Sequence, residues 1–334
     1  MDLLTDLDRR GLIHDSTDRG ALASRLADGP IGVYVGFDPT ADSLHVGHLV
    51  GQLYLRRFQM AGHKPFPLAG GATGMVGDPS GRSDERNLLD LDTLRHNVSC
   101  IETQLQRLLD FSPGRFQAKL VNNADWTEPI TLLDFLRDVG KYVTVNQMLA
   151  KDSVRSRLDS DTGLSFTEFS YSLLQANDFR HLYEHEGVEM QAGGSDQWGN
   201  IVAGVDLIRR SLSKSAHAMT HPLVTKADGT KFGKSVGGAV WLDPAQTSPY
   251  QFRQFWIQVD DAMVGRYLQM FSLRAVSELA DEIEAHQAAP ERRAAQRALA
   301  DELTELVHGP GALDAARSAT EVLFGGDPTT ASEA

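Results

Sequence analysis

Apolar and polar positions along this chain follow two periods, one typical of strands and one typical of helices. Short apolar runs rich in β-branched and aromatic residues predict extended segments at residues 31–37, 65–69, 116–121, 188–191 and 222–225. Between them apolar residues recur at helical spacing, as in a helix expected to be capped by Asp42 or Ser43 and to end at Gly62. Because strands and helices alternate with long connections, the pattern predicts an α/β fold with a parallel sheet.

The alternation of predicted strands and helices ends after residue 225. We expect residues 1–225 to form the α/β domain, with a helical insertion at about 126–166. Residues 131–158 carry apolar side chains on more than one helix face, which suggests pairing with another chain. Residues 226–325 are expected to form a loop and an all-α domain, and 326–334 resemble a linker.

Composition narrows the class of protein. The 334 residues are 41% hydrophobic and 23% charged, as in ordinary globular proteins, and no apolar run approaches the ~20 residues of a membrane span. Cys100 is the only cysteine, which excludes a disulfide framework and a thiolate metal site and suits the reducing cytoplasm. The net charge is −13, of which −8 falls in residues 278–334, so RNA would have to meet local basic patches.

The stretch Y-V-G-F-D-P-T-A-D-S-L-H-V-G-H, residues 34–48, predicts a strand, a tight turn and a helix N-terminus. Such a corner binds anions, because free N–H groups and the positive end of the helix dipole meet there. His45 and His48 are three apart and project from one side of the first turn, and Gly47 lets a flat ring approach the backbone. H-x-G-H alone is a weak signal; its place at this corner strengthens it.

Two further stretches suggest ligand contacts. Residues 70–82, G-G-A-T-G-M-V-G-D-P-S-G-R, are glycine-rich without a Walker lysine, so they predict either a flexible surface loop or a floor beneath a ligand with Asp78 as its carboxylate. Arg82 and Arg86, four apart, suit phosphate. Asn123 follows the third predicted strand at its carboxyl end, where ligands bind in open α/β sheets.

The helix that begins with the capping box of Ser165 and Glu168 carries an unusual polar stripe. At ~100° per residue, Tyr171, Gln175 and Asp178 fall within about 60° of one another. Solvent faces are normally rich in Lys and Glu. This stripe of donors and acceptors therefore favours a small-molecule pocket over a solvated face.

Positive charge gathers in three places. The loop A-D-G-T-K-F-G-K-S, residues 227–235, holds two lysines around a glycine and suits polyanion charge that develops in a transition state, although such loops are also common at surfaces. Residues 151–157 form a basic strip, and residues 209–210 end a helix. The strip at 151–157 is typical of a solvated helix face. At 209–210, stabilisation of the helix dipole explains the arginines as well as RNA contact does.

Together these stretches resemble the bacterial tyrosyl-tRNA synthetases, a class I aminoacyl-tRNA synthetase family, over essentially the whole chain. His45 to His48 match the HIGH signature and Lys231 to Ser235 match the KMSKS signature in its K-F-G-K-[ST] form. More specific are four strings in the family's order: Y-x-G-F-D-P-T, G-A-T-G-x-x-G-D-P-S-G, T-E-F-S-Y-x-x-L-Q-x-x-D-F and G-G-S-D-Q-W-G-N. The resemblance implies a Rossmann-like nucleotide-binding domain followed by a helical domain.

The resemblance also implies the reaction. L-tyrosine would attack the α-phosphate of ATP, releasing pyrophosphate with Mg²⁺ carried by the nucleotide and no protein-ligated metal. The tyrosyl group would then pass to the terminal ribose of tRNA(Tyr). Residues implied in catalysis are Thr40, His45, His48, Arg82, Arg86, Lys231, Lys234 and Ser235. Residues implied in tyrosine binding are Tyr34, Asp78, Tyr171, Gln175, Asp178 and Gln197.

Further residues are implied in binding the other substrates. Those for ATP are Gly36, Asp38, Gly47, Asn123, Gly194, Asp196 and Lys234. Those for tRNA are Lys151, Arg155, Arg157, Arg209 and Arg210. The resemblance further implies a cytoplasmic homodimer that does not enter membranes, with the dimer contact in the helical insertion.

The sequence departs from the family pattern in three ways. Arg82 replaces a common lysine and Ser235 a common threonine. Bacterial members usually continue into a small RNA-binding domain, whereas this chain stops at a linker-like tail, so we expect adenylate formation to be intact and tRNA charging to be weak. The alternatives are a tryptophanyl-tRNA synthetase, a shorter H-x-G-H nucleotidyltransferase and a synthetase-derived RNA-binding protein. The pair Tyr34 and Asp178, suited to a phenol, argues against the first.

Overall fold

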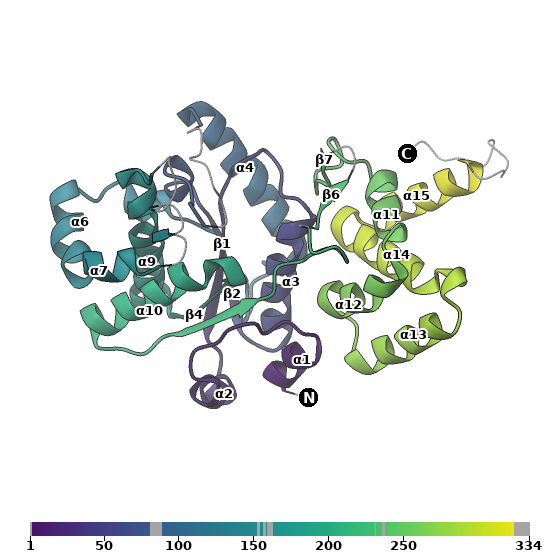
Figure 1. Cartoon of the computed structure of the whole chain (residues 1–334), viewed down its shortest axis with the longest axis horizontal. Coiled ribbons are helices and arrows are strands. Elements are labelled where there is room, and N and C mark those ends of the chain that lie inside the picture. The colour runs from purple at the N-terminus through teal and green to yellow at the C-terminus, as the bar shows by residue number, and fades with distance from the viewer. Residues whose placement is uncertain are drawn as a thin grey trace. The chain divides into compact units, whose positions relative to one another are not determined.

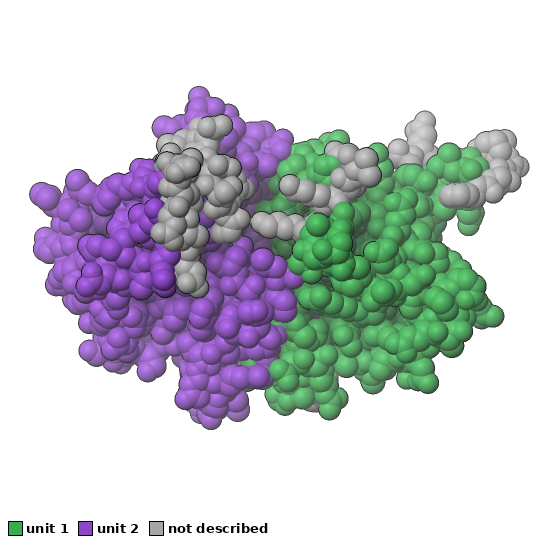
Figure 2. Space-filling view, viewed as in Figure 1, with its two compact units in different colours: residues 1–12, 43–53, 224–334 green, residues 13–42, 54–223 purple. Residues whose placement is uncertain are grey.

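The computed structural model describes residues 2–80, 89–151, 154, 155, 158, 163–230, 232–235 and 238–323. Of Lys234 and Ser235 it describes the backbone alone. The chain divides into two compact units, shown in Figure 2. Unit 1 comprises residues 1–12, 43–53 and 224–334, and unit 2 comprises residues 13–42 and 54–223. The domain limits expected from the sequence stay a prediction.

Unit 2 is built on the predicted parallel sheet (Figure 1). Its five strands lie in the order β3-β2-β1-β4-β5 and all neighbours run parallel. The strands are β1 (Gly32–Phe37), β2 (Lys64–Ala69), β3 (Val121–Asn122), β4 (Val188–Gly194) and β5 (His217–His221). β1 and β4 approach so closely that a Cβ on Gly32 would lie 2.8 Å from the Cα of Val188. The α/β fold class predicted from the sequence is confirmed.

Two strands differ from their predicted limits. The segment expected at 116–121 is a strand only from Val121, although the Lys119 N–H already donates to the Pro65 carbonyl of β2 at 3.0 Å, and the Phe116 carbonyl accepts from the Gln59 side chain at 3.0 Å. The segment expected at 222–225 is wrong: the strand is His217–His221, which ends just before Pro222. Proline has no N–H to donate to a neighbouring strand, so the ladder stops there.

Helices cover this sheet and extend from it. They are α2 (Arg19–Asp28), α4 (Leu91–Leu108), α5 (Ala124–Thr127), α6 (Leu132–Asp138), α7 (Val145–Leu149), α9 (Phe166–Glu186) and α10 (Trp198–Leu212), with short 3₁₀ turns η1 (Thr73–Met75), η2 (Gly140–Tyr142) and η3 (Ser195–Gln197). α9 and α10 pack against each other and against β4. The core between them and the sheet includes Tyr34, Phe66, Phe179 and Ile208.

The helix α3 (Val46–Met60) begins later than expected and crosses from unit 1 into unit 2 at Tyr54. The Ser43 hydroxyl donates to the Leu44 carbonyl at 2.8 Å and accepts from the N–H of Asp243 at 3.1 Å. The first helical N–H, that of Val46, donates to the Val240 carbonyl at 3.0 Å. The next N–H, that of Gly47, donates to the ring of His45, which directly precedes the helix. A distant backbone carbonyl and a local side chain thus share the N-terminus of α3.

Unit 1 is mainly helical. Its other elements are α1 (Leu3–Arg9), the antiparallel pair β6 (Lys234–Ser235) and β7 (Gly238–Ala239), α11 (Pro249–Ile257), α12 (Asp261–Phe271), α13 (Val276–Ala288), η4 (Pro290–Arg292), α14 (Ala294–His308) and α15 (Pro310–Leu323). Aromatic rings fill its core: Trp256 is fully buried and packs against Phe252, Phe271 and Tyr267. Among the described helices of both units, none is both long and apolar enough to cross a membrane.

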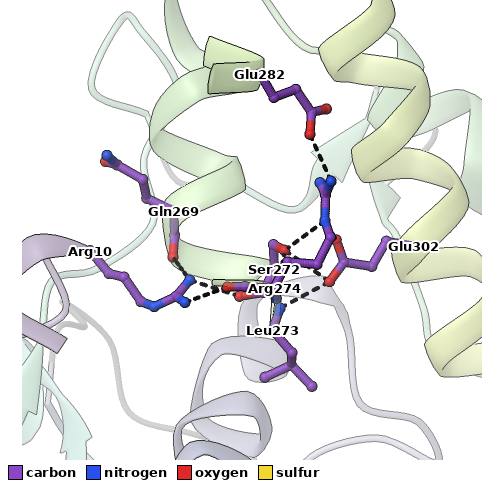
Figure 3. A network of polar contacts seen from close by, with 7 residues as sticks. All are labelled: Arg10, Gln269, Ser272, Leu273, Arg274, Glu282 and Glu302. Carbon is purple, nitrogen blue, oxygen red and sulfur yellow. Dashed lines mark hydrogen bonds and ion pairs between the residues drawn. The ribbon is translucent and has the colours of Figure 1, made fainter. Parts of the chain in front are cut away.

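A buried arginine joins the chain's N-terminal segment to this helical core (Figure 3). Arg10 is 4% exposed, and its guanidinium donates to the carbonyls of Gln269, Ser272 and Arg274 at 3.3, 3.0 and 2.6 Å. Its Nε pairs with Asp6 at 2.8 Å. The last carbonyls of a helix have no partner within that helix, so Arg10 caps the C-terminal end of α12.

We expect Arg10→Met to lower the free energy of unfolding by about 3 kcal/mol, because it leaves Asp6 and several carbonyls without their donor. Urea denaturation of the whole chain measures this. The matched control is Arg9→Met, since Arg9 is exposed beside it, and it should stay within about 0.5 kcal/mol of the parent. Equal effects of the two substitutions would contradict this role of Arg10.

Candidate active site

The first group of candidate residues lies where the strands of unit 2 end. β1, β2 and β3 stop at Phe37, Ala69 and Asn122. In a parallel sheet these carboxyl ends share one edge, and the residues that follow them come together there. Asp38, Thr73 and Asn123 follow these three ends and are in hydrogen-bond contact. The predicted location of the site at this edge therefore matches where these side chains meet.

A chain of hydrogen bonds connects two carboxylates along this edge. The Tyr171 hydroxyl donates to Asp38 Oδ2 at 2.8 Å, and the Thr73 hydroxyl donates to Asp38 Oδ1 at 2.8 Å. The Asn123 amide donates to Thr73 Oγ1 at 3.0 Å and to Asp178 Oδ2 at 2.9 Å. Asn123 is fully buried and its side-chain oxygen accepts from the N–H of Ala72. Both of its N–H groups are therefore engaged inside the protein.

Asp178 is the most perturbed acid of this group. It is 2% exposed and lies on α9, and its second oxygen accepts from the Trp126 indole N–H at 2.9 Å. Burial raises the pKa of Asp178 to about 7, against the lowering by its bonds to Asn123 and Trp126. The carboxyl group is thus close to the midpoint of its titration at neutral pH.

Tyr34, in β1, presents an unusual hydroxyl to the same region. The side chain is 1% exposed, and its hydroxyl has no hydrogen-bond partner within the described part of the chain. Burial, and then the charge of Asp178, raise the pKa of Tyr34 well above its usual range. A buried hydroxyl without a partner costs about 1–3 kcal/mol unless a ligand supplies one.

A second cluster of acceptors surrounds Tyr171. Burial first, then Asp38, Asp78 and Asp178, raise the pKa of the Tyr171 hydroxyl. Gln175, one turn further along α9, has a buried side-chain oxygen that accepts no hydrogen bond from the residues described. Asp78 accepts from Gln197 Nε2 at 2.6 Å and from the N–H of Ser80 at 2.9 Å. Within the predicted stripe Tyr171 thus donates to a carboxylate, Asp178 accepts from two donors, and Gln175 presents an oxygen without a described partner.

Glycine keeps the floor of this region open. A Cβ on Gly70 would lie 2.5 Å from the Thr73 hydroxyl and would collide with Asp38 as well. Gly36 differs, because a Cβ there would meet nothing closer than 3.9 Å. Thr40 and Asp196 are exposed. Gly194 is the last residue of β4, and a Cβ there would lie 2.8 Å from Asp196 Oδ1.

The two signature histidines lie in unit 1. The rings of His45 and His48 stack with centroids 3.9 Å apart, as expected for residues on one side of the first turn. The His45 N–H donates to Nδ1 of His48 at 3.2 Å, and the Gly47 N–H donates to Nδ1 of His45 at 3.0 Å. These bonds assign the ring proton to Nε2 in each case. Burial, then His45, lower the pKa of His48 to about 3, so its ring is neutral at pH 7.

Gly47 is required for this pairing. A Cβ on Gly47 would lie 2.8 Å from the ring of His45. In the same unit a Cβ on Gly233 would lie 2.9 Å from Cγ2 of Val46, and φ of Gly233 is +94°. Gly47 therefore makes room for the His45 ring within its own segment, and Gly233 lets the second signature segment approach the first closely.

Phe232 holds the second signature segment in unit 1. It is 8% exposed, and its ring lies 4.5 Å from that of Tyr267 and 5.0 Å from that of Phe255. The Phe232 N–H donates to the Val224 carbonyl at 3.1 Å. Lys231, Arg82, Arg86 and Arg157 lie outside the described residues, as do the side chains of Lys234 and Ser235.

The basic residues proposed for tRNA differ in their surroundings. The Lys151 amine is buried, and burial lowers its pKa to about 8 while the charge of Asp78 raises it. Arg155 is exposed. Arg209 pairs with Asp206 at 3.0 Å, and Arg210 donates to the Tyr142 carbonyl at 3.0 Å. The spacing of these residues in the sequence could not show which of them are buried, exposed or paired with other groups.

Sequence reasoning missed three residues of this region. Thr73 lies inside the glycine-rich string and bridges Asp38 and Asn123. Trp126 follows Asn123 by one turn and reaches the same carboxylate. Gln191 is paired in register with Tyr34 across β1 and β4, is 2% exposed, and has a side-chain oxygen without a partner in the described ranges. A buried polar residue within an apolar strand was the available signal for Gln191.

Comparisons with known proteins agree with one another. Residues 26–325 match the family described as tRNA synthetases class I (W and Y). A tyrosine–tRNA ligase from Roseiflexus castenholzii is 56% identical over 326 residues, 97% of this chain and 76% of that protein. One from Bacillus caldotenax is 53% identical over 328 residues, covering 98% of this chain and 78% of that protein.

Solved structures of aminoacyl-tRNA synthetases are also similar to this chain. A C-terminally truncated mitochondrial tyrosyl-tRNA synthetase from Aspergillus nidulans has a TM-score of 0.88 at 33% identity, and the match covers 97% of this chain and 94% of that one. A tryptophanyl-tRNA synthetase from Encephalitozoon cuniculi has a TM-score of 0.66 at 14% identity, covering 93% of this chain and 86% of that one. The latter likeness concerns the fold alone.

Proposed function

The chain belongs to the class I tRNA synthetases for tryptophan and tyrosine, and we propose how its residues perform the reaction. Its activity is that of a tyrosine–tRNA ligase, given 53–56% identity to such enzymes over nearly its full length. ATP is the co-substrate that this family uses. The roles of individual residues, the metal carried with ATP and the assembly are our proposals.

The phenol of tyrosine binds between Tyr34 and Asp178. The unpartnered, buried Tyr34 hydroxyl close to the charge of Asp178 is the observation that carries this assignment. A phenol can donate to a carboxylate and accept from a hydroxyl, whereas an indole N–H can only donate and a benzyl side chain can do neither. Tyrosine alone among the three aromatic amino acids satisfies both groups.

The α-ammonium of tyrosine binds at the second cluster, to Asp78, Tyr171 and Gln175. The buried Gln175 oxygen supports this, since it lacks a donor among the described residues. Three carboxylates act on the Tyr171 hydroxyl, which favours a cation there. Gln197 donates to Asp78 and orients that carboxylate; its contact with the tyrosine carboxylate stays a prediction.

ATP binding is assigned residue by residue, each on its own chemistry. His45 and His48 offer Nε2–H donors to phosphate oxygens, and Thr40 offers an exposed hydroxyl. Gly36, Asp38, Gly47, Gly194 and Asp196 are assigned to the adenosine and ribose. Because both Asn123 N–H groups are engaged by Thr73 and Asp178, we assign Asn123 to orienting Asp178 rather than to touching ATP.

The reaction needs positioning and charge stabilisation rather than a covalent intermediate. The tyrosine carboxylate attacks the α-phosphate in line, and pyrophosphate leaves. Arg82, Arg86, Lys231, Lys234 and Ser235 are assigned to the charge that develops on the leaving group. Mg²⁺ carried by ATP would supply positive charge to its phosphates, and no residue of this chain is assigned to hold the ion. Arg155, Arg157, Arg209 and Arg210, with Lys151, remain the candidates for tRNA contact, and the cytoplasm is the proposed compartment.

ATP–pyrophosphate exchange with tyrosine, tryptophan and phenylalanine tests this function. We expect exchange with tyrosine. Phenylalanine should react roughly 10⁴-fold less efficiently, the order found for sites that hydrogen-bond a substrate hydroxyl, for which tyrosyl-tRNA synthetases are the standard example. Exchange with tryptophan instead would show that the chain is a tryptophanyl-tRNA synthetase. A protein that exchanges with none of them yet retains RNA would be a synthetase-derived binding protein.

We propose that the helical insertion forms a homodimer contact. Leu132, Leu133 and Leu136 on α6 are 72%, 76% and 51% exposed, and Phe166 at the start of α9 is 78% exposed. All four lie in residues 126–166, where the sequence suggested contact with another chain. Monomeric proteins rarely expose so many large apolar side chains within one short region.

Leu133→Glu is expected to shift the protein from dimer to monomer, because it places a charge in an apolar contact that excludes water. Sedimentation velocity at micromolar concentration measures the change. Met60→Glu is the matched control, since Met60 is 59% exposed at the end of α3 and lies outside this region. A monomeric parent, or dimers of both variants with equal stability, would refute the proposed contact.

A further inference from the structure

Trp126 is held against α9 by two separate contacts. Its indole N–H donates to Asp178 at 2.9 Å. Its ring lies flat on that of His181, with centroids 4.5 Å apart and planes 13° apart. Asp178 and His181 are three residues apart on one helix and therefore lie on the same face. One face of α9 thus fixes both the donor atom and the plane of the indole.

Trp126 has little support from its own element. It belongs to α5, which has only four residues, and its side chain is half-buried. A helix this short has little stability of its own, so the orientation of the indole depends on contacts with α9. Its hydrogen bond to Asp178 requires that orientation, since hydrogen bonds weaken steeply when they bend.

We propose that His181 is a positioning residue for tyrosine recognition: by stacking on Trp126 it keeps the indole N–H directed at the carboxylate of Asp178. The inference rests on the proposed role of Asp178 in binding the phenol. His181 itself needs no contact with tyrosine. It acts through Trp126 on the Asp178 carboxylate, which is proposed to bind the phenol.

The surroundings of His181 suit a neutral stacking partner. Burial, then the neighbouring His185, lower the pKa of His181 to about 4, so the ring is uncharged at pH 7. The His185 ring lies 4.4 Å from that of His181 and is tilted by 47° against it. Among the described ring pairs His185 has no contact with Trp126, whereas His181 stacks flat on the indole.

The test compares His181→Ala, His181→Phe and His185→Ala in ATP–pyrophosphate exchange. Stacked aromatic pairs contribute enough to change an affinity by roughly two- to tenfold. We expect His181→Ala to raise the KM for tyrosine by about that factor and to leave the KM for ATP unchanged. His181→Phe keeps a flat ring and should restore most of the loss. His185→Ala, the matched control, should stay close to the parent.

A double-mutant cycle separates positioning from general destabilisation. Trp126→Phe retains a ring and removes the N–H donor, so adding His181→Ala to it should raise the KM for tyrosine little further. Independent, multiplicative effects would overturn the proposal, and so would an unchanged KM in a folded His181→Ala protein. If Tyr34→Phe alters tyrosine binding while His181→Ala does not, the proposed function stands and this inference fails. If neither does, phenol recognition itself is wrong.

Discussion

The burial of Asp178 is the constraint on which the proposed tyrosine-binding region depends. An isolated carboxylate is costly to bury, and a protein tolerates it only with donors placed around it. Here Asn123 and Trp126 supply two of them. Asn123 follows β3 and Trp126 lies on α5, while Asp178 comes from α9. The strand ends and one helix face must therefore be correctly placed before these donors meet the carboxylate, so this hydrogen-bonded group depends on the fold.

In unit 1, backbone hydrogen bonds hold the two signature segments together. Its two signature segments are distant in the sequence, and the Val46 N–H bonds to Val240 while the Val240 N–H bonds to the Gly233 carbonyl at 2.9 Å. Gly233 permits this approach because it carries no Cβ. Phe232 anchors the loop in an aromatic core. Both rings accept a backbone N–H at Nδ1, and burial keeps the ring of His48 neutral.

Local sequence signals predicted the elements that depend on local physics. β1, β2 and the start of α9 were expected from β propensity and from the Ser165 cap, which accepts from the Glu168 N–H at 3.2 Å. The errors have separate causes. The strand expected at residues 222–225 is His217–His221, because Pro222 has no N–H for the ladder, and the first N–H of α3 finds its partner in the distant Val240 carbonyl. Likewise the spacing of Tyr171, Gln175 and Asp178 revealed the polar face of α9, but no pattern revealed that Trp126 and Thr73 complete it.

The most direct measurement of the central claim is the ratio of kcat/KM for tyrosine to that for phenylalanine in pyrophosphate exchange, before and after Tyr34→Phe. Because the Tyr34 hydroxyl is buried without a partner within the described chain, the substrate phenol should be what satisfies it. The ratio is then expected to fall by roughly three- to tenfold, the worth of one neutral hydrogen bond. An unchanged ratio in a folded variant would mean that Tyr34 does not read the phenol, and the assignment of this region to tyrosine recognition would be wrong.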